Sequence, residues 1–235
     1  MNAEPQKSQF AGQIVIAGEL AVCDARGALY FPDLGLLTVS DLHLEKGSSY
    51  ARRGQLLPPY DTAATLQKLA SVMADYKPRM VISLGDSFHD GGGANRMPQT
   101  FRDSLIELML GREWLWVAGN HDPDAPGDLP GSTVTELAIG GLRFRHEPLS
   151  GASAGEIAGH LHPGAVVVHK GRAVRRRCFA TDGERLIMPA FGAYTGMLNV
   201  LDKAYRGLFR WEAFVAHVLG DSRVFAISRR LLRGS

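Results

Sequence analysis

Residues 80–86 read Met-Val-Ile-Ser-Leu-Gly-Asp, an apolar run of strand length that ends in a glycine and a carboxylate. Such a run, bounded by turn residues, predicts a short buried strand. Helical spacing of apolar residues before and after it predicts helices over residues 66–76 and 101–109. Beyond these helices, residues 36–40 and 114–118 read as further strands. Because strands and helices alternate, the middle of the chain is expected to form a parallel sheet.

Outside this central part, the chain reads as short strands with few helices between them. The expected strands are residues 14–17, 20–23, 28–31, 134–139, 142–145, 165–169, 173–180, 185–188 and 224–228. The predicted fold class is therefore α/β, with two stacked mixed β-sheets flanked by helices. No linker divides the sequence, so we expect a flexible tail over residues 1–9 and a single domain over residues 10–235.

The composition is that of an ordinary globular enzyme. Of 235 residues, 45% are hydrophobic and 21% are charged, and the net charge of +2 indicates no particular partner. No apolar run approaches the roughly 18–20 residues that cross a bilayer, and the first ten residues are too polar for a secretory signal. We therefore expect a cytoplasmic protein without membrane contact, in which Cys23 and Cys178 are reduced thiols.

Five short segments carry side chains that bind metals, and each follows a predicted strand end or lies close to one. They are Asp41-Leu42-His43, Gly85-Asp86, Gly119-Asn120-His121-Asp122, His146, and Gly159-His160-Leu161-His162. Carboxylate, amide and imidazole donors without thiolate suit manganese, iron, zinc or magnesium. In extended chain, Asp-X-His and His-X-His each place two side chains on one side. The pattern predicts a metal centre at the carboxyl edge of the sheet.

The order of these five segments resembles that of the calcineurin-like metallophosphoesterases. A narrower resemblance, over residues 27–228, is to the bacterial ligase-associated DNA damage response endonucleases. It is carried by DLHLEKGSSYARRGQLLPPYDT, GDSFHDGGG, GNHDPD, GEIAGHLHP, RRRCFA and PAFGAYTGMLNVLD. One departure is that His89 stands where the wider family has an aspartate, with Asp90 one position later, so neither residue receives the family role.

The resemblance implies a four-layer sandwich with two divalent metal ions, manganese being favoured over iron, zinc or magnesium. Asp41, His43 and His162 would hold the first metal. Asn120, His146 and His160 would hold the second, and Asp86 would bridge the two. His121 would be catalytic, stabilising the transition state or protonating the leaving group, and Asp122 beside it would tune its pKa or cap a turn. The subgroup also implies a DNA repair context and a functional association with a DNA ligase and a helicase.

A cluster of cations follows the last metal-binding segment. It comprises Lys170, Arg172, Arg175, Arg176 and Arg177, and it is either a track for a phosphate backbone or a solvated strand face. Strand alternation places Arg175 and Arg177 on one face and Arg176 on the other.

Several other residues receive weaker predictions. Arg52 and Arg53, expected in a loop after His43, are further candidates for substrate binding, as is Lys46, and Tyr194 would stack on a base or pack. For His169, His217, Trp114 and Trp116 we expect packing or other non-catalytic roles.

These features leave three functions in competition. The favoured one is a nuclease or phosphodiesterase acting on DNA, because of the basic cluster and the narrower resemblance. The second is a phosphatase or pyrophosphatase acting on a small nucleotide-type substrate, which would use the same metals. The third, a non-catalytic binding scaffold, is disfavoured because every expected ligand and His121 are present.

Overall fold

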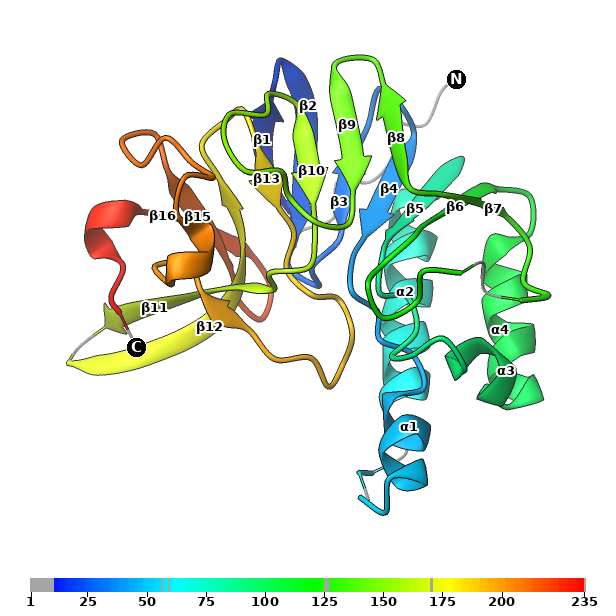
Figure 1. Ribbon diagram of the computed structural model, residues 1–235. Coiled ribbons are helices and arrows are strands. Elements are labelled where there is room, and N and C mark those ends of the chain that lie inside the picture. Colours follow the sequence, from blue (N-terminus) through cyan, green and yellow to red (C-terminus); the bar gives the residue numbers. More distant parts are fainter. Residues whose placement is uncertain (1–10, 56, 59, 125–126, 170, 235) are drawn as a thin grey trace.

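Two β-sheets pack face to face, and the helices lie on the outer side of the first sheet (Figure 1). The computed structural model describes residues 11–234 except residues 56, 59, 125–126 and 170. The tail predicted over residues 1–9 therefore lies outside the described residues. None of the helices in the described part is long and apolar enough to span a bilayer.

The first sheet has seven strands that follow one another in sequence order. They are β1 (Ala11–Ile16), β2 (Glu19–Asp24), β3 (Leu29–Phe31), β4 (Leu36–Val39), β5 (Met80–Leu84), β6 (Glu113–Val117) and β7 (Ser132–Val134). The first four strands form an antiparallel meander, and β4 to β7 are parallel. The predicted parallel centre is confirmed.

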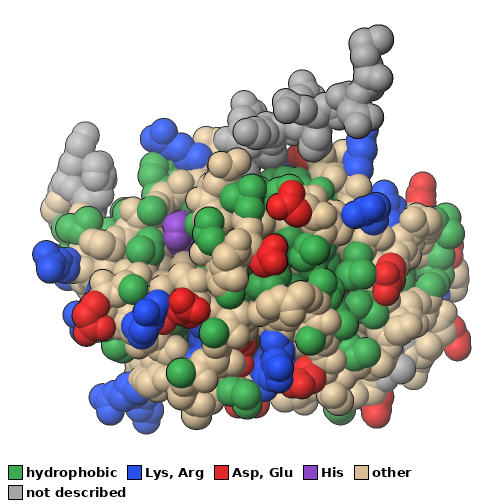
Figure 2. Space-filling view, turned by 90° about the horizontal axis from the view of Figure 1, so that it is seen from above, with side chains coloured by type: hydrophobic (Ala, Val, Ile, Leu, Met, Phe, Trp, Pro, Cys, Tyr) green, Lys and Arg blue, Asp and Glu red, His purple; other side chains and the backbone are tan. Residues whose placement is uncertain are grey.

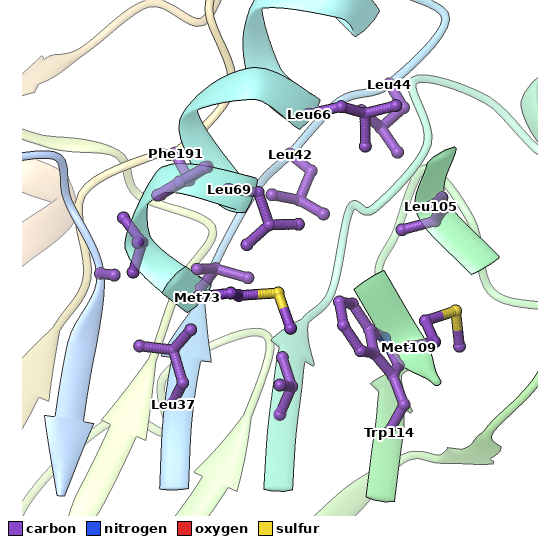
Figure 3. Packing of buried hydrophobic residues seen from close by; sticks show 14 of the residues in the cluster. Leu37, Leu42, Leu44, Leu66, Leu69, Met73, Leu105, Met109, Trp114 and Phe191 are labelled. Atoms are coloured by element: carbon purple, nitrogen blue, oxygen red, sulfur yellow. The ribbon is translucent and has the colours of Figure 1, made fainter. Parts of the chain in front are cut away.

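Helices α2 (Asp61–Tyr76), α3 (Gly93–Arg96) and α4 (Gln99–Met109) contribute apolar side chains to the core on the outer face of this sheet. Helix α1 (Lys46–Arg52) lies beyond the ends of the strands, beside α2 and α3 (Figure 1). Figure 3 shows Leu66, Leu69 and Met73 of α2 lying over the sheet, beside Leu105 of α4 and Trp114 of β6. The helix expected over residues 66–76 thus buries the face that its periodicity indicates.

The second sheet has nine strands and is mixed. It contains β8 (Glu136–Ile139), β9 (Leu142–Arg145), β10 (Glu156–Ala158), β11 (Pro163–His169), β12 (Arg172–Thr181), β13 (Leu186–Ile187), β14 (Leu198–Asn199), β15 (Val215–Leu219) and β16 (Val224–Ser228). Strand β10 is parallel to both β9 and β13, whereas β12 is antiparallel to β11, β13 and β15.

Alternate side chains of the second sheet enter two different cores. Ile157 and Phe179 point toward the first sheet, whereas Ala158 and Cys178 point outward. The outer face is covered by residues 200–214, which contain only a short 3₁₀ helix (Lys203–Tyr205). The predicted fold class is confirmed. The layer over the outer face of the second sheet is irregular chain, and Tyr205 and its apolar neighbours pack against that face.

The structure differs from the local predictions in three respects. The strand expected over residues 134–139 is two strands, since the chain leaves the first sheet after Val134 and enters the second at Glu136. Strands β10, β14 and β15 were not expected, and His217 lies half-buried on β15. Arg52 and Arg53 are not in a loop, because Arg52 ends α1 and Arg53 caps it.

Candidate metal centre

The five predicted segments meet at one end of the two sheets. Asp41, Asp86 and Asn120 follow β4, β5 and β6, and His146 and His160 follow β9 and β10. The segments are also tied to one another. The backbone N–H of His43 donates to the Asp86 carbonyl oxygen at 2.9 Å, and the backbone N–H of His160 donates to Asp41 Oδ2 at 3.1 Å. Parallel strands therefore bring ligands that are far apart in sequence to a common edge.

The backbone at these positions is unusual. Five predicted ligands have a φ in the left-handed region: Asp41 (53°), His43 (43°), Asp86 (47°), His160 (67°) and His162 (46°). The pairs Asp41/His43 and His160/His162 therefore converge through tight turns and not through extended chain, contrary to the sequence-based argument. Non-glycine residues in this region cost about 1–3 kcal/mol each and cluster at functional sites.

Asp41, His43 and His162 form the first group of potential metal ligands. Nε2 of His162 lies 3.1 Å from Oδ1 of Asp41 and 3.5 Å from Nε2 of His43. Ligand atoms that share one cation at about 2.0–2.2 Å lie roughly 3 Å apart when they are adjacent in its coordination sphere. The spacing of this group suits one divalent cation.

A second group of donors surrounds Nε2 of His146. This atom lies 3.0 Å from Oδ1 of Asn120, 3.3 Å from Nδ1 of His160 and 3.4 Å from Oδ1 of Asp86. The other ring nitrogen of His146 is 3.1 Å from the Leu84 carbonyl oxygen, to which it donates when protonated. That bond leaves Nε2 free to coordinate a metal.

Asp86 lies between the two groups. Its Oδ1 is the oxygen near His146, whereas its Oδ2 lies 3.8 Å from Nε2 of His43 in the first group. The carboxylate is almost completely buried, and its Oδ1 also accepts the backbone N–H of His121 at 3.0 Å. Each oxygen therefore faces a different group of donors.

The protonation states suit a metal site. Burial lowers the pKa of His43 to about 3, and it also lowers the pKa of His160. Burial opposes ionisation of Asp41, but its contacts with His162, His146 and Ser40 together outweigh burial and lower the carboxyl pKa. Metals bind neutral imidazole and ionised carboxylate. The directions of these shifts favour the forms in which His43, His160 and Asp41 bind a divalent cation.

Ser40 contacts a candidate metal ligand and was not predicted from the sequence. Its hydroxyl donates to Oδ2 of Asp41 at 2.5 Å and thereby orients that carboxylate. Gly159 allows this contact, since a Cβ at position 159 would stand 2.0 Å from the serine hydroxyl. The position of Ser40 directly before Asp-X-His is the only sequence signal for this role.

His121 lies at the rim of the site, with 44% of its side chain exposed. Its Nε2 is 4.0 Å from Oδ2 of Asp86. Its ring stacks on that of His89, with centroids 5.5 Å apart and an interplanar angle of 18°, and Tyr50 lies 5.6 Å beyond His89. The imidazole is thus held over the cluster while remaining open to a substrate.

Asp122 and Asp90 contact residues outside the two groups of potential metal ligands. Oδ2 of Asp122 accepts the backbone N–H of Phe88 at 2.9 Å, which ties together the two loops that carry Asp86 and Asn120. Burial raises the pKa of the Asp122 carboxyl to about 7. No ion pair joins it to His121 in the described part of the chain. Asp90 is paired with Arg96 at 2.7 Å.

The basic cluster divides between two faces of β12. Arg175 and Arg177 donate to backbone carbonyls of residues 190–197, whereas Arg176 lies on the opposite face, as predicted. Arg172 is exposed, and Lys170 lies outside the described residues. Figure 2 shows the side of the molecule away from α1, where acidic and basic side chains are interspersed.

Three further cations, Lys46, Arg52 and Arg53, follow the first metal-binding segment along the chain. Arg52 and Arg53 line a hollow of about 310 Å³ together with Ser49 and Asp90. Burial, with the charges of Lys46 and Arg53 contributing, lowers the pKa of His89 to about 4.

A two-sheet α/β sandwich with buried carboxylate and imidazole donors at its strand ends is the architecture of a metal-dependent phosphoesterase. The chain belongs to the calcineurin-like phosphoesterase family, whose model matches residues 35–188. Family and fold thus make it a hydrolase of phosphate esters.

Solved structures similar to the chain include a nuclease and a phosphoesterase. A nuclease MPE from Pseudomonas putida has 26% sequence identity and a TM-score of 0.71, over 92% of this chain and 100% of that one. YfcE, a phosphoesterase from E. coli, has 14% identity and a TM-score of 0.42, over 82% of this chain and 98% of that one. No curated protein matches the chain.

Proposed function

We propose that this protein is a dinuclear-metal phosphodiesterase that cleaves nucleic acid. We infer a dinuclear centre from the position of Asp86, whose two oxygens face two different groups of donors. Two cations about 3.5–4 Å apart need such a shared carboxylate to offset their repulsion. Manganese is the proposed metal, because oxygen and imidazole donors suit it.

In this proposal, Asp41, His43 and His162 hold one cation, Asn120, His146 and His160 hold the other, and Asp86 contacts both. The bound cations would supply an activated water nucleophile and offset charge on the phosphate oxygens. The chain itself fixes the geometry. Ser40 orients Asp41, and the Leu84 carbonyl selects the tautomer of His146.

His121 is the proposed general acid. Its exposed ring and its position 4.0 Å from Asp86 leave Nε2 free to approach a leaving oxygen beside the cluster. Stacking on His89 restricts rotation of the ring. Asp122 would act by holding together the loops that carry Asp86 and His121.

Nucleic acid is favoured as the substrate by two observations. The similarity to the Pseudomonas putida nuclease extends over the full length of that chain. In addition, Arg52 and Arg53 line a hollow beside the loop that carries His89, where they would contact phosphates flanking the cut site. Exposed Arg172 would extend this contact. The repair context, the association with a ligase and a helicase, and the cytoplasmic location remain predictions.

The test is a manganese-supplemented assay with three kinds of substrate: bis-p-nitrophenyl phosphate, p-nitrophenyl phosphate and defined DNA. We expect turnover of the diester and of DNA to exceed turnover of the monoester. Preferential hydrolysis of monoesters with intact DNA would favour a small-molecule phosphatase. No turnover of any of the three by metal-loaded protein would favour a binding scaffold.

A further inference from the structure

Residues 190–197, here called the platform segment, run alongside the first metal-binding segment. The backbone N–H of Phe191 donates to the Ser40 carbonyl oxygen at 2.8 Å, and that of Gly192 donates to the Asp41 carbonyl oxygen at 3.1 Å. A Cβ at position 192 would lie 2.2 Å from the Leu42 carbonyl oxygen, so only glycine permits this approach. In Figure 1 the segment, drawn in gold, descends between α1 and β12.

Cationic side chains hold the carbonyl oxygens of the platform segment. Arg177 donates to Ala190 and Gly192 at 3.0 Å each and to Thr195 at 2.9 Å. Lys46 donates to Tyr194 at 2.9 Å, Arg175 to Met197 at 2.5 Å, and Lys68 to Phe191. Four cations from α1, α2 and β12 thus fix one short segment, which makes it rigid in spite of its two glycines.

Two of these cations are half-buried and have no carboxylate within ion-pair distance in the described part of the chain. Neither Lys68 nor Arg177 forms an ion pair with any described residue. Burial lowers the pKa of Lys68 to about 7, and the nearby Arg177 contributes to this shift. Arg177 is held by backbone carbonyls and not by a carboxylate, so its positive charge favours an anionic ligand over the platform segment.

Tyr194 is the exposed aromatic residue of this segment, with 36% of its surface accessible. Its ring contacts no other aromatic ring and no cation within the described part of the chain. Tyr194 is two residues after Gly192, so the Cα atoms of the two residues lie within about 7 Å of each other. The backbone N–H of Gly192 in turn donates to the Asp41 carbonyl oxygen. A rigid segment therefore presents an unused aromatic face close to the metal centre.

We propose that Tyr194 determines specificity by stacking on the nucleobase next to the scissile phosphate. Nucleoside phosphodiesters would then be cleaved in preference to simple alkyl or aryl phosphodiesters. This inference rests on the proposed function and adds a residue and a substrate preference to it. Every base has a flat aromatic face, so such stacking tolerates different sequences, and the cations beneath the segment favour the charged backbone.

The experiment compares Tyr194→Ala with Tyr194→Phe, which keeps the ring. The substrates are methyl p-nitrophenyl phosphate and the 5′- and 3′-(p-nitrophenyl phosphates) of thymidine, which share a leaving group and differ in the base. For each enzyme, kcat/KM for a nucleoside ester is divided by kcat/KM for the methyl ester. Loss of stacking should lower at least one ratio by about 5- to 150-fold in Tyr194→Ala, and Tyr194→Phe should retain it.

Three outcomes would overturn the proposal, and they are distinguishable. Unchanged ratios in Tyr194→Ala would show that the ring contacts no base, while leaving the proposed function intact. Equal losses on the methyl and nucleoside esters would mean that Tyr194 supports the metal centre instead. A wild-type enzyme that cleaves the methyl ester and neither nucleoside ester would refute both the nucleic-acid substrate and the platform.

Discussion

Replacement of Gly119 by alanine should disable the metal centre while leaving the fold in place. A Cβ at this position would lie 2.2 Å from the backbone nitrogen of Asp86, 2.3 Å from its Oδ1 and 2.6 Å from Oδ1 of Asp122. Nonbonded atoms approach favourably only to about 3.5 Å, so the loops carrying Asp86 and Asn120 must separate by roughly 1 Å. A displacement of that size at a catalytic centre costs about 100-fold in rate.

The assay for Gly119→Ala combines diester turnover, metal content and thermal unfolding. We expect turnover to fall about 100-fold, with weaker metal retention and an overpacking cost of about 1–3 kcal/mol in the free energy of unfolding. Gly141→Ala is the matched control, because a Cβ there meets no atom within 4 Å. Turnover within threefold of wild type for Gly119→Ala would refute the reasoning.

Two further substitutions test the proposed general acid and the stability of the fold separately. His121→Ala should retain its metals but lose about 10²- to 10⁴-fold in turnover of substrates with poor leaving groups. Loss on p-nitrophenyl esters should be smaller, and an equal loss on both would exclude a role as the acid. Arg185→Ala should lower the free energy of unfolding by about 3–5 kcal/mol. Arg185 is buried, with Nε 2.5 Å from Oε2 of Glu156. The exposed Arg206→Ala should change stability by less than about 0.5 kcal/mol, and a similar loss in both variants would contradict this account.

The centre of the fold was predictable because its strands are apolar runs with helices of clear periodicity between them. The run over residues 80–84 is β5, and residues 66–76 lie within α2. The ligands were then predictable as a set, because carboxyl ends of neighbouring parallel strands meet at one edge. Strand β15 carried weaker signals, since His217 interrupts its apolar pattern at a half-buried position.

The residues that form the metal centre were more predictable from the sequence than their geometry. The Asp-X-His and His-X-His patterns predict extended chain around Asp41 and His160, but both residues have left-handed φ angles that only tertiary contacts can hold. Long-range contacts also decide what the cations do. The sequence suggests that Arg177 belongs to a phosphate-binding track, but its guanidinium donates to three backbone carbonyls 13 to 18 residues further along the chain. No local pattern encodes that partner.

The most direct test of a dinuclear centre is the metal content of Asp86→Ala beside that of the wild type. Both proteins are loaded with manganese, freed of loosely bound ions and analysed for metal per chain. Because the two oxygens of Asp86 face two different groups of donors, we predict two metals in the wild type and loss of tight binding in the variant. Two tightly held metals per chain in Asp86→Ala, or no more than one in the wild type, would contradict the account.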